Sequence, residues 1–170
     1  RAFGGALVRS KLENVFAYRH RLTRDDLALH RRFADRPRMR VLLTGGSGLI
    51  GNSLVPLLST GGHTAVRLQR GTGANQWDPA RGRLEPQVLD GIDAVVHLSG
   101  ANVGGGRWTE ARRAEIVSSR LDSTRVLIEG MAASRSRPRV LVCASASGYY
   151  GPGGDEWLEE DDPAGRGFLA

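Results

Sequence analysis

From Met39 onward, short apolar runs typical of strands alternate with longer stretches in which apolar residues recur at helical spacing. The β-prone runs lie at 39–43, 64–68, 93–98 and 139–144, with a weaker one at 75–78, and the helical patterns cover 48–58 and 109–133. Strands that alternate with helices are typical of a parallel sheet covered by helices. The sequence therefore predicts an α/β fold.

The two predicted helices have recognisable ends. Gly61 and Gly62 follow the first helix, as glycines that end helices do, and Thr109 is a candidate N-cap for the second. The apolar positions expected to face the sheet are Leu49, Ile50, Leu54, Leu57 and Leu58 in the first helix and Ile116, Leu121, Val126, Leu127 and Met131 in the second.

The amino-terminal part of the chain has a different pattern, in which apolar and basic residues are interleaved from Leu12 to Phe33. Thr23 is a candidate N-cap for a short helix, with Asp25 and Asp26 in its first turn. The segment 34–38 contains Pro37 and fits a linker. We therefore divide the chain into residues 1–36, the tail of a preceding domain or a linker, and an α/β domain over residues 37–170.

A glycine-rich segment joins the first strand to the first helix. Gly45, Gly48 and Gly51 form the pattern G-x-x-G-x-x-G at this junction. The pyrophosphate of a dinucleotide requires backbone N–H groups and a positive helix end at close range, which a Cβ would obstruct. A glycine turn with a purely structural role is the alternative. We predict a dinucleotide site whose contacts include Gly45, Ser47, Gly48, Leu49, Ile50 and Gly51.

The end of the second strand bears on the choice of cofactor. An acidic residue there binds the ribose 2′-hydroxyl of NAD, whereas an arginine accommodates the 2′-phosphate of NADP. Gln69 and Arg70 occupy this position, and no acid follows before Asp78. The sequence therefore favours NADP, although an arginine-rich chain could carry Arg70 there by chance.

Net charge changes this picture little. The formal charge is +6 and the pI about 10.6, but basic residues crowd the first forty positions, and acids dominate 155–162, which we expect to be a solvated turn. All basic residues except Lys11 are arginines, which fits a coding bias. Because no basic patch is interleaved with aromatic residues, we do not expect a nucleic-acid partner.

The remaining composition indicates a protein of the cytoplasm. The single Cys143 excludes an internal disulfide and fits a reducing compartment, and the cysteine and histidine positions do not have zinc-site spacing. No apolar run approaches the roughly 20 residues that cross a bilayer, so no membrane association is expected.

Several separated motifs, in the order in which they occur, resemble those of one protein family. They are Thr44–Gly51, Trp77–Pro79, Val96–Asn102, Arg107-Trp108, Ser119-Arg120 and Ser145–Gly151. Together they resemble the epimerase-like branch of the extended short-chain dehydrogenases/reductases, the NAD-dependent epimerase/dehydratase family with sugar-nucleotide epimerases. The segments Phe16–His20 and Asp26-Leu27 resemble the end of a START-like domain.

The resemblance implies a Rossmann-type doubly wound parallel sheet, incomplete at its C-terminal side, that binds NADP. It places Gln69 and Arg70 near the adenosine phosphate, and it adds cofactor contacts at Leu98, Ser99, Gly100, Glu115 and Arg120. Judged by residue type alone, charged residues on a long helix are more often solvated.

The family also implies a catalytic tyrosine, a lysine four residues later that lowers the tyrosine pKa, and a serine that orients the substrate. This chain contains no Tyr-x-x-x-Lys, for which truncation and divergence are both open explanations. Ser145 is the candidate orienting serine, with Ser147 as the alternative. His97 and Cys143 lie inside apolar strands and are expected in the core.

We therefore expect an NADP-dependent oxidoreductase or epimerase that transfers hydride at a hydroxyl-bearing carbon of a small molecule, for which a nucleotide sugar is one candidate, and that assembles as a homodimer. The alternative is a sensor or regulator that binds NADP without turnover.

Overall fold

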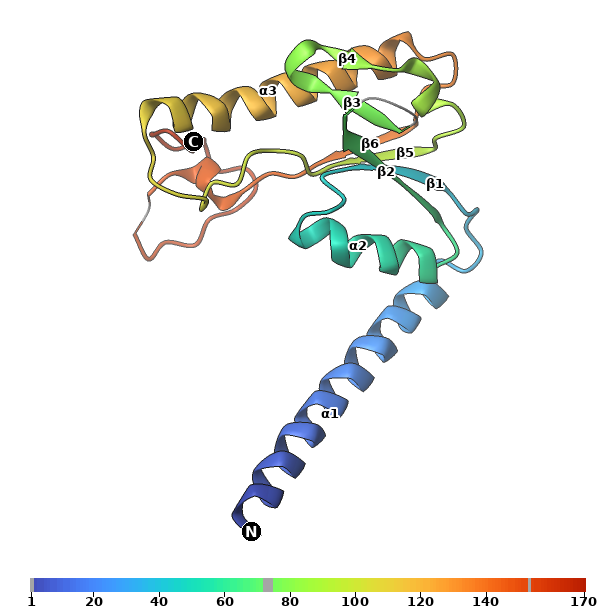
Figure 1. Ribbon diagram of the computed structural model, residues 1–170, viewed down its shortest axis with the longest axis vertical. Helices are drawn as coiled ribbons and strands as arrows, with labels where there is room; N and C mark the ends of the chain where they lie inside the picture. Colours follow the sequence, from blue (N-terminus) through green and yellow to red (C-terminus); the bar gives the residue numbers. More distant parts are fainter. Residues whose placement is uncertain (1, 72–74, 153) are drawn as a thin grey trace.

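The computed structural model describes residues 2–71, 75–152 and 154–170. A six-stranded sheet has the order β4-β3-β2-β1-β5-β6, and every neighbouring pair is parallel except β3 with β4 (Figure 1). The strands are β1 (Arg40–Thr44), β2 (Thr64–Arg70), β3 (Gln76–Asp78), β4 (Arg83–Leu84), β5 (Ala94–His97) and β6 (Val140–Cys143). The α-helices are α1 (Ala2–Arg32), α2 (Leu49–Thr60) and α3 (Glu110–Ala133). Short 3₁₀ turns cover Pro79–Arg81, Pro86–Leu89 and Ser147–Tyr150.

The two helices of the α/β domain cover opposite faces of the sheet (Figure 1). Alternate residues of a strand point to opposite faces, so each strand contributes to both layers. On one face Leu42 and Val95 pack with Val126 and Leu127 of α3. On the other face Val41, Leu43 and Ala94 pack with Leu54, Val55 and Leu58 of α2. This confirms the predicted Rossmann-type, doubly wound fold in an incomplete form.

The predicted helix ends are confirmed. The Thr109 hydroxyl accepts a hydrogen bond from the Arg112 backbone N–H at 3.2 Å, and this cap starts α3. Gly61 ends α2, and Gly62 then takes a left-handed conformation with φ +81°.

Three of the apolar positions expected to face the sheet are exposed instead. Leu49 and Ile50 are 90% and 59% exposed because they lie in the first turn of α2, where only Gly51 is buried against the loop below. Leu121 is 62% exposed because it lies five residues from both Ile116 and Val126. Five residues rotate a helix by about 140°, which turns Leu121 away from the sheet.

The amino-terminal segment is one helix rather than a short one starting at Thr23. Thr23 lies inside α1, which has no proline to stop it, so the expected N-cap is wrong. The described contact of α1 with the domain includes a hydrogen bond between His30 Nε2 and Thr60 Oγ1 at 3.2 Å. Whether residues 1–36 end a preceding domain stays a prediction.

Neither α1 nor any other helix of the described ranges is long and apolar enough to span a membrane.

Candidate dinucleotide site

The glycine segment forms the tight connection between β1 and α2 at the carboxyl edge of the sheet. Gly45 has φ +66°, and a Cβ there would lie 2.7 Å from the carbonyl carbon and oxygen of Leu98. A Cβ on Gly51 would lie 2.6 Å from the Gly45 oxygen and from Gly46 Cα. The absence of both Cβ atoms therefore lets the end of β5 and the start of α2 approach the loop.

The start of α2 is suited to an anion. The Gly48 N–H donates to the Gly45 carbonyl at 3.0 Å, which closes the turn. Gly48 is the N-cap and has no side chain to bond the first helical N–H groups. Those groups and the positive helix end remain available to a ligand, as phosphate-binding helices require. A dinucleotide pyrophosphate thus fits this loop.

The exposed Leu49 and Ile50 stand directly after this loop, so they present apolar surface to solvent at the place where a cofactor would lie. Their packing role is therefore wrong, whereas their role in contacting the cofactor stays a prediction. Ser47 lies in the loop itself, and its contact with the cofactor also stays a prediction.

Strand β2 extends past β1 at this edge. Leu68 pairs with Thr44, the last residue of β1, so Gln69 and Arg70 project beyond the strand that carries the glycine loop. Both side chains are exposed, and Arg70 has no ion pair among the residues that the structure covers. Arg70 thus lies at the end of the second strand, and its contact with a 2′-phosphate stays a prediction, as does the cofactor contact of Gln69.

The segment after β5 lies against the glycine loop. The Leu98 N–H donates to the Thr44 carbonyl and to the Thr44 hydroxyl, both at 3.2 Å. Leu98 and Ser99 are half-buried and Gly100 is exposed. These three residues therefore share one edge of the sheet with Gly45.

Arg120 of α3 reaches this segment. Its Nη1 donates to the Ala101 carbonyl at 3.2 Å and to the Ile116 carbonyl at 3.0 Å, and a Cβ on Gly100 would lie 3.1 Å from its Cζ. The Ser119 hydroxyl accepts from the Ala101 N–H at 2.9 Å. Through these hydrogen bonds to Ala101, Arg120 and Ser119 hold the segment after β5 against α3.

Glu115 forms an exposed ion pair with Arg112 at 2.6 Å. The Arg112 guanidinium also donates to the Asn102 carbonyl, and therefore links Glu115 indirectly to the loop after β5. Sequence reasoning missed Arg112, whose contacts depend on how α3 packs over that loop.

A buried polar cluster lies behind the loop. His97 Nδ1 is 2.6 Å from the Thr44 hydroxyl, and Nε2 is 3.1 Å from the Thr124 hydroxyl and 3.3 Å from that of Ser123. The ring also lies edge-on to buried Trp77, with centroids 6.3 Å apart. Burial lowers the pKa of His97 from its ordinary value. The expected core position of His97 is confirmed.

The expected core position of Cys143 is wrong, because its side chain is exposed. Strand β6 is the last strand in the sheet order, and Val140 and Val142 are also about half exposed. Apolar residues on an edge strand need a further neighbour to become buried.

The catalytic candidate Ser145 follows β6 at the same sheet edge and is exposed. Its alternative, Ser147, starts the 3₁₀ turn that ends at Tyr150. Tyr149 and Tyr150 pack edge to face, with centroids 5.2 Å apart. The acidic segment after this turn is almost entirely exposed, as expected for a solvated loop.

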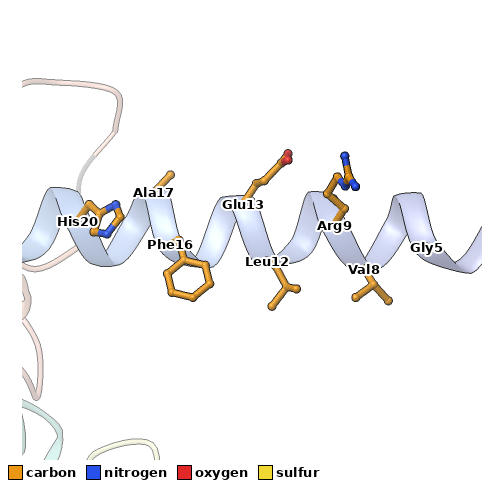
Figure 2. A pocket seen from close by; sticks show the side chains of 8 residues that line it. All are labelled: Gly5, Val8, Arg9, Leu12, Glu13, Phe16, Ala17 and His20. Carbon is orange, nitrogen blue, oxygen red and sulfur yellow. The ribbon is translucent and has the colours of Figure 1, made fainter.

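A shallow hollow lies elsewhere, along one exposed side of α1. Figure 2 shows Val8, Leu12 and Phe16 pointing to one side of the helix and Arg9 and Glu13 pointing away from them. A single helix face cannot enclose a dinucleotide, so the chemistry of the glycine loop, not this hollow, locates the candidate site.

Comparison with known proteins identifies the family of the chain. The family described as NAD dependent epimerase/dehydratase matches residues 41–166. The chain belongs to the NAD-dependent epimerase/dehydratase family. This confirms the family resemblance of the sequence motifs, and the match extends over most of the α/β domain.

Relatives and solved structures agree with this assignment. An epimerase family protein of Mycobacterium bovis is 40% identical over 134 residues, which cover 76% of this chain and 44% of that protein. The nucleoside-diphosphate sugar epimerase from Corynebacterium glutamicum superposes with TM-score 0.74 and 34% identity, covering 91% of this chain and 33% of that one. Human epimerase family protein SDR39U1, solved with NADPH, has TM-score 0.65 and 30% identity over 77% of this chain and 45% of its own. This chain therefore spans less than half the length of these relatives.

Proposed function

We propose that this chain is the NADP-binding part of an oxidoreductase or epimerase of the extended short-chain dehydrogenase type. The reaction is hydride transfer at a hydroxyl-bearing carbon of a small molecule, with a nucleotide sugar as the substrate class. The observation that carries the proposal is the glycine loop, whose missing Cβ atoms let β5 and α2 approach it, at the same edge of the sheet at which β2 ends in the exposed Arg70. The cytoplasmic location and the homodimer expected from the sequence stay predictions.

The preference for NADP rests on Arg70 together with one relative. Human SDR39U1 was solved with NADPH, whereas the more distant MoeE5, at 28% identity, was solved with UDP-glucose and NAD. The family therefore accommodates both nicotinamide cofactors. A guanidinium at the end of β2 favours the 2′-phosphate, which NAD lacks.

The roles of the residues in this chain follow from their positions. When bound, the nicotinamide supplies the hydride chemistry. The glycine loop and the start of α2 bind the pyrophosphate, and Arg70 holds the 2′-phosphate. The exposed Ser145 hydroxyl, after β6, orients the substrate hydroxyl by a hydrogen bond.

Substituting Arg70 tests the cofactor assignment. Arg70→Ala is expected to weaken NADPH binding by about 2 kcal/mol, or roughly thirtyfold, because a charge-assisted hydrogen bond to phosphate is lost. NADH binding should be unchanged. Titration of the purified chain with each cofactor, followed by nicotinamide fluorescence, measures both constants. Equal affinity of the unsubstituted chain for NADPH and NADH would contradict the preference for NADP.

A second candidate function is an NADP-binding sensor that turns nothing over. The observation that favours it is the lack of a Tyr-x-x-x-Lys sequence in this chain. The whole protein, incubated with NADP and a panel of nucleotide sugars, distinguishes the two functions. Absorbance of NADPH or an epimerised product would establish the enzyme, whereas tight binding without either would establish the sensor.

A further inference from the structure

We propose that Arg67 is a second determinant of cofactor specificity and binds the 2′-phosphate of NADP together with Arg70. The proposal rests on the proposed function, since it concerns the same cofactor. Its structural basis is the contact between the Arg67 side chain and Gly46, in the middle of the glycine loop.

Arg67 occupies a face of the sheet on which apolar residues are otherwise found. It pairs with Leu43 in the register of β1 and β2, and the neighbouring Leu68 is buried on the α3 face. Alternation along the strand puts Arg67 on the α2 face, where Leu43 and Ala65 pack. Arg67 is exposed there, at the carboxyl end of the sheet. Because it is exposed, the Arg67 charge is accessible to a ligand at this end of the sheet.

The Arg67 stem is directed over the glycine loop. A Cβ on Gly46 would lie 3.1 Å from Arg67 Cγ, 3.5 Å from Cδ and 3.7 Å from Arg67 Cβ. The aliphatic stem therefore fills the space that a side chain at position 46 would need. The stem thus starts the side chain over the loop, and the exposed guanidinium beyond it is free to bind a ligand there.

No protein acid neutralises these charges in the part of the chain that the structure describes. The ion pairs there join Arg24 with Asp25, Arg81 with Asp78, Arg112 with Glu115 and Arg125 with Asp122. Arg67 and Arg70 thus carry two unpaired positive charges on β2. Arg67 lies on the face that α2 covers, whereas Arg70 is the last residue of the strand, so a ligand at the end of β2 can meet both long side chains. The end of this strand is the ribose side of a Rossmann site, and the 2′-phosphate is a dianion that two guanidinium groups match in charge.

The test uses adenosine ligands that differ only in the 2′-phosphate. The purified chain and its Arg67→Ala variant are titrated by calorimetry with 2′,5′-ADP and with 5′-AMP, and by fluorescence with NADPH and NADH. Loss of the Arg67 contact is expected to weaken 2′,5′-ADP and NADPH binding about tenfold and to leave 5′-AMP and NADH unchanged. Arg67→Lys should recover part of the loss, because it keeps the charge but not the forked geometry.

Arg40→Ala is the matched control, since Arg40 is an exposed arginine at the opposite, amino-terminal end of β1. It removes the same charge and should leave all four affinities unchanged. Equal weakening of 2′,5′-ADP and 5′-AMP by Arg67→Ala would assign Arg67 to the 5′-phosphate and overturn the proposal. Unchanged NADPH affinity in Arg67→Ala, with the expected loss in Arg70→Ala, would overturn it while the proposed function stands. An unsubstituted chain that binds none of the four ligands would overturn both.

Discussion

Gly45→Ala is expected to abolish measurable NADPH binding and to lower the free energy of unfolding by about 3 kcal/mol. Two costs add. An L-residue at φ +66° costs roughly 1–2 kcal/mol. The new Cβ would also lie 2.7 Å from backbone atoms of Leu98, which cannot turn aside as a side chain can, and such overpacking costs roughly 1–3 kcal/mol. Denaturant unfolding and fluorescence titration measure the two effects.

Gly82→Ala is the control, because Gly82 has the same φ of +66° but a Cβ there would have no neighbour within 4 Å. It should lower stability by about 1 kcal/mol from backbone strain alone, with NADPH affinity intact. The difference between the two variants then measures the steric contact between the loop and β5. If Gly45→Ala bound NADPH as the unsubstituted chain does, the loop would not be the cofactor site.

The order of strands and helices was predictable because each element carries its own local signal. The glycine turn between the first strand and helix, the Thr109 cap and the Gly61-Gly62 stop depend on residues a few positions apart, and the structure confirms that these elements begin and end there. Strand β4 was missed because two residues, Arg83 and Leu84, are too few to form a pattern. Only the antiparallel pairing of Arg83 and Leu84 with β3 identifies this strand.

The exposure of individual residues was less predictable, because burial depends on what an element packs against. Leu49 and Cys143 both have apolar neighbours in the sequence, yet both are exposed. Leu49 is the first residue of α2, beyond the edge of the sheet, and Cys143 lies on the edge strand β6. The Arg67 contact with Gly46 has no local signature either, since the pairing of β2 with β1 brings the two residues together.

The cluster around His97 joins three elements that support the candidate site. Thr44 ends β1, His97 ends β5, and Ser123 and Thr124 lie on α3. The Ser123 hydroxyl donates to the Arg120 carbonyl at 3.1 Å, so toward His97 it is an acceptor. We therefore assign the hydrogen to Nε2, and Nδ1 accepts from the Thr44 hydroxyl. In this assignment a neutral imidazole satisfies the cluster.

His97→Leu is expected to destabilise the protein by about 2 kcal/mol, because it leaves the buried Thr44 and Ser123 hydroxyls without their ring partner. NADPH affinity should also fall, since Thr44 accepts the Leu98 N–H beside the glycine loop. His20→Leu, on an exposed turn of α1, is the control and should change neither quantity. Equal stability of the two variants in urea would contradict a structural role for the cluster.

The pKa of His97 gives the same cluster a pH signature. Burial lowers this pKa below 6.5, so the folded state keeps the ring neutral at a pH where the unfolded chain binds a proton. Stability should therefore be complete above about pH 7 and fall as the pH drops below 6.5, by up to about 1.4 kcal/mol per unit. The hydroxyl partners of the ring are neutral and do not titrate in this range. Urea unfolding between about pH 5 and 8 measures this slope. The unsubstituted chain and His20→Leu should show it, whereas His97→Leu should not. Parallel slopes in all three proteins would mean that other groups cause the loss of stability at low pH.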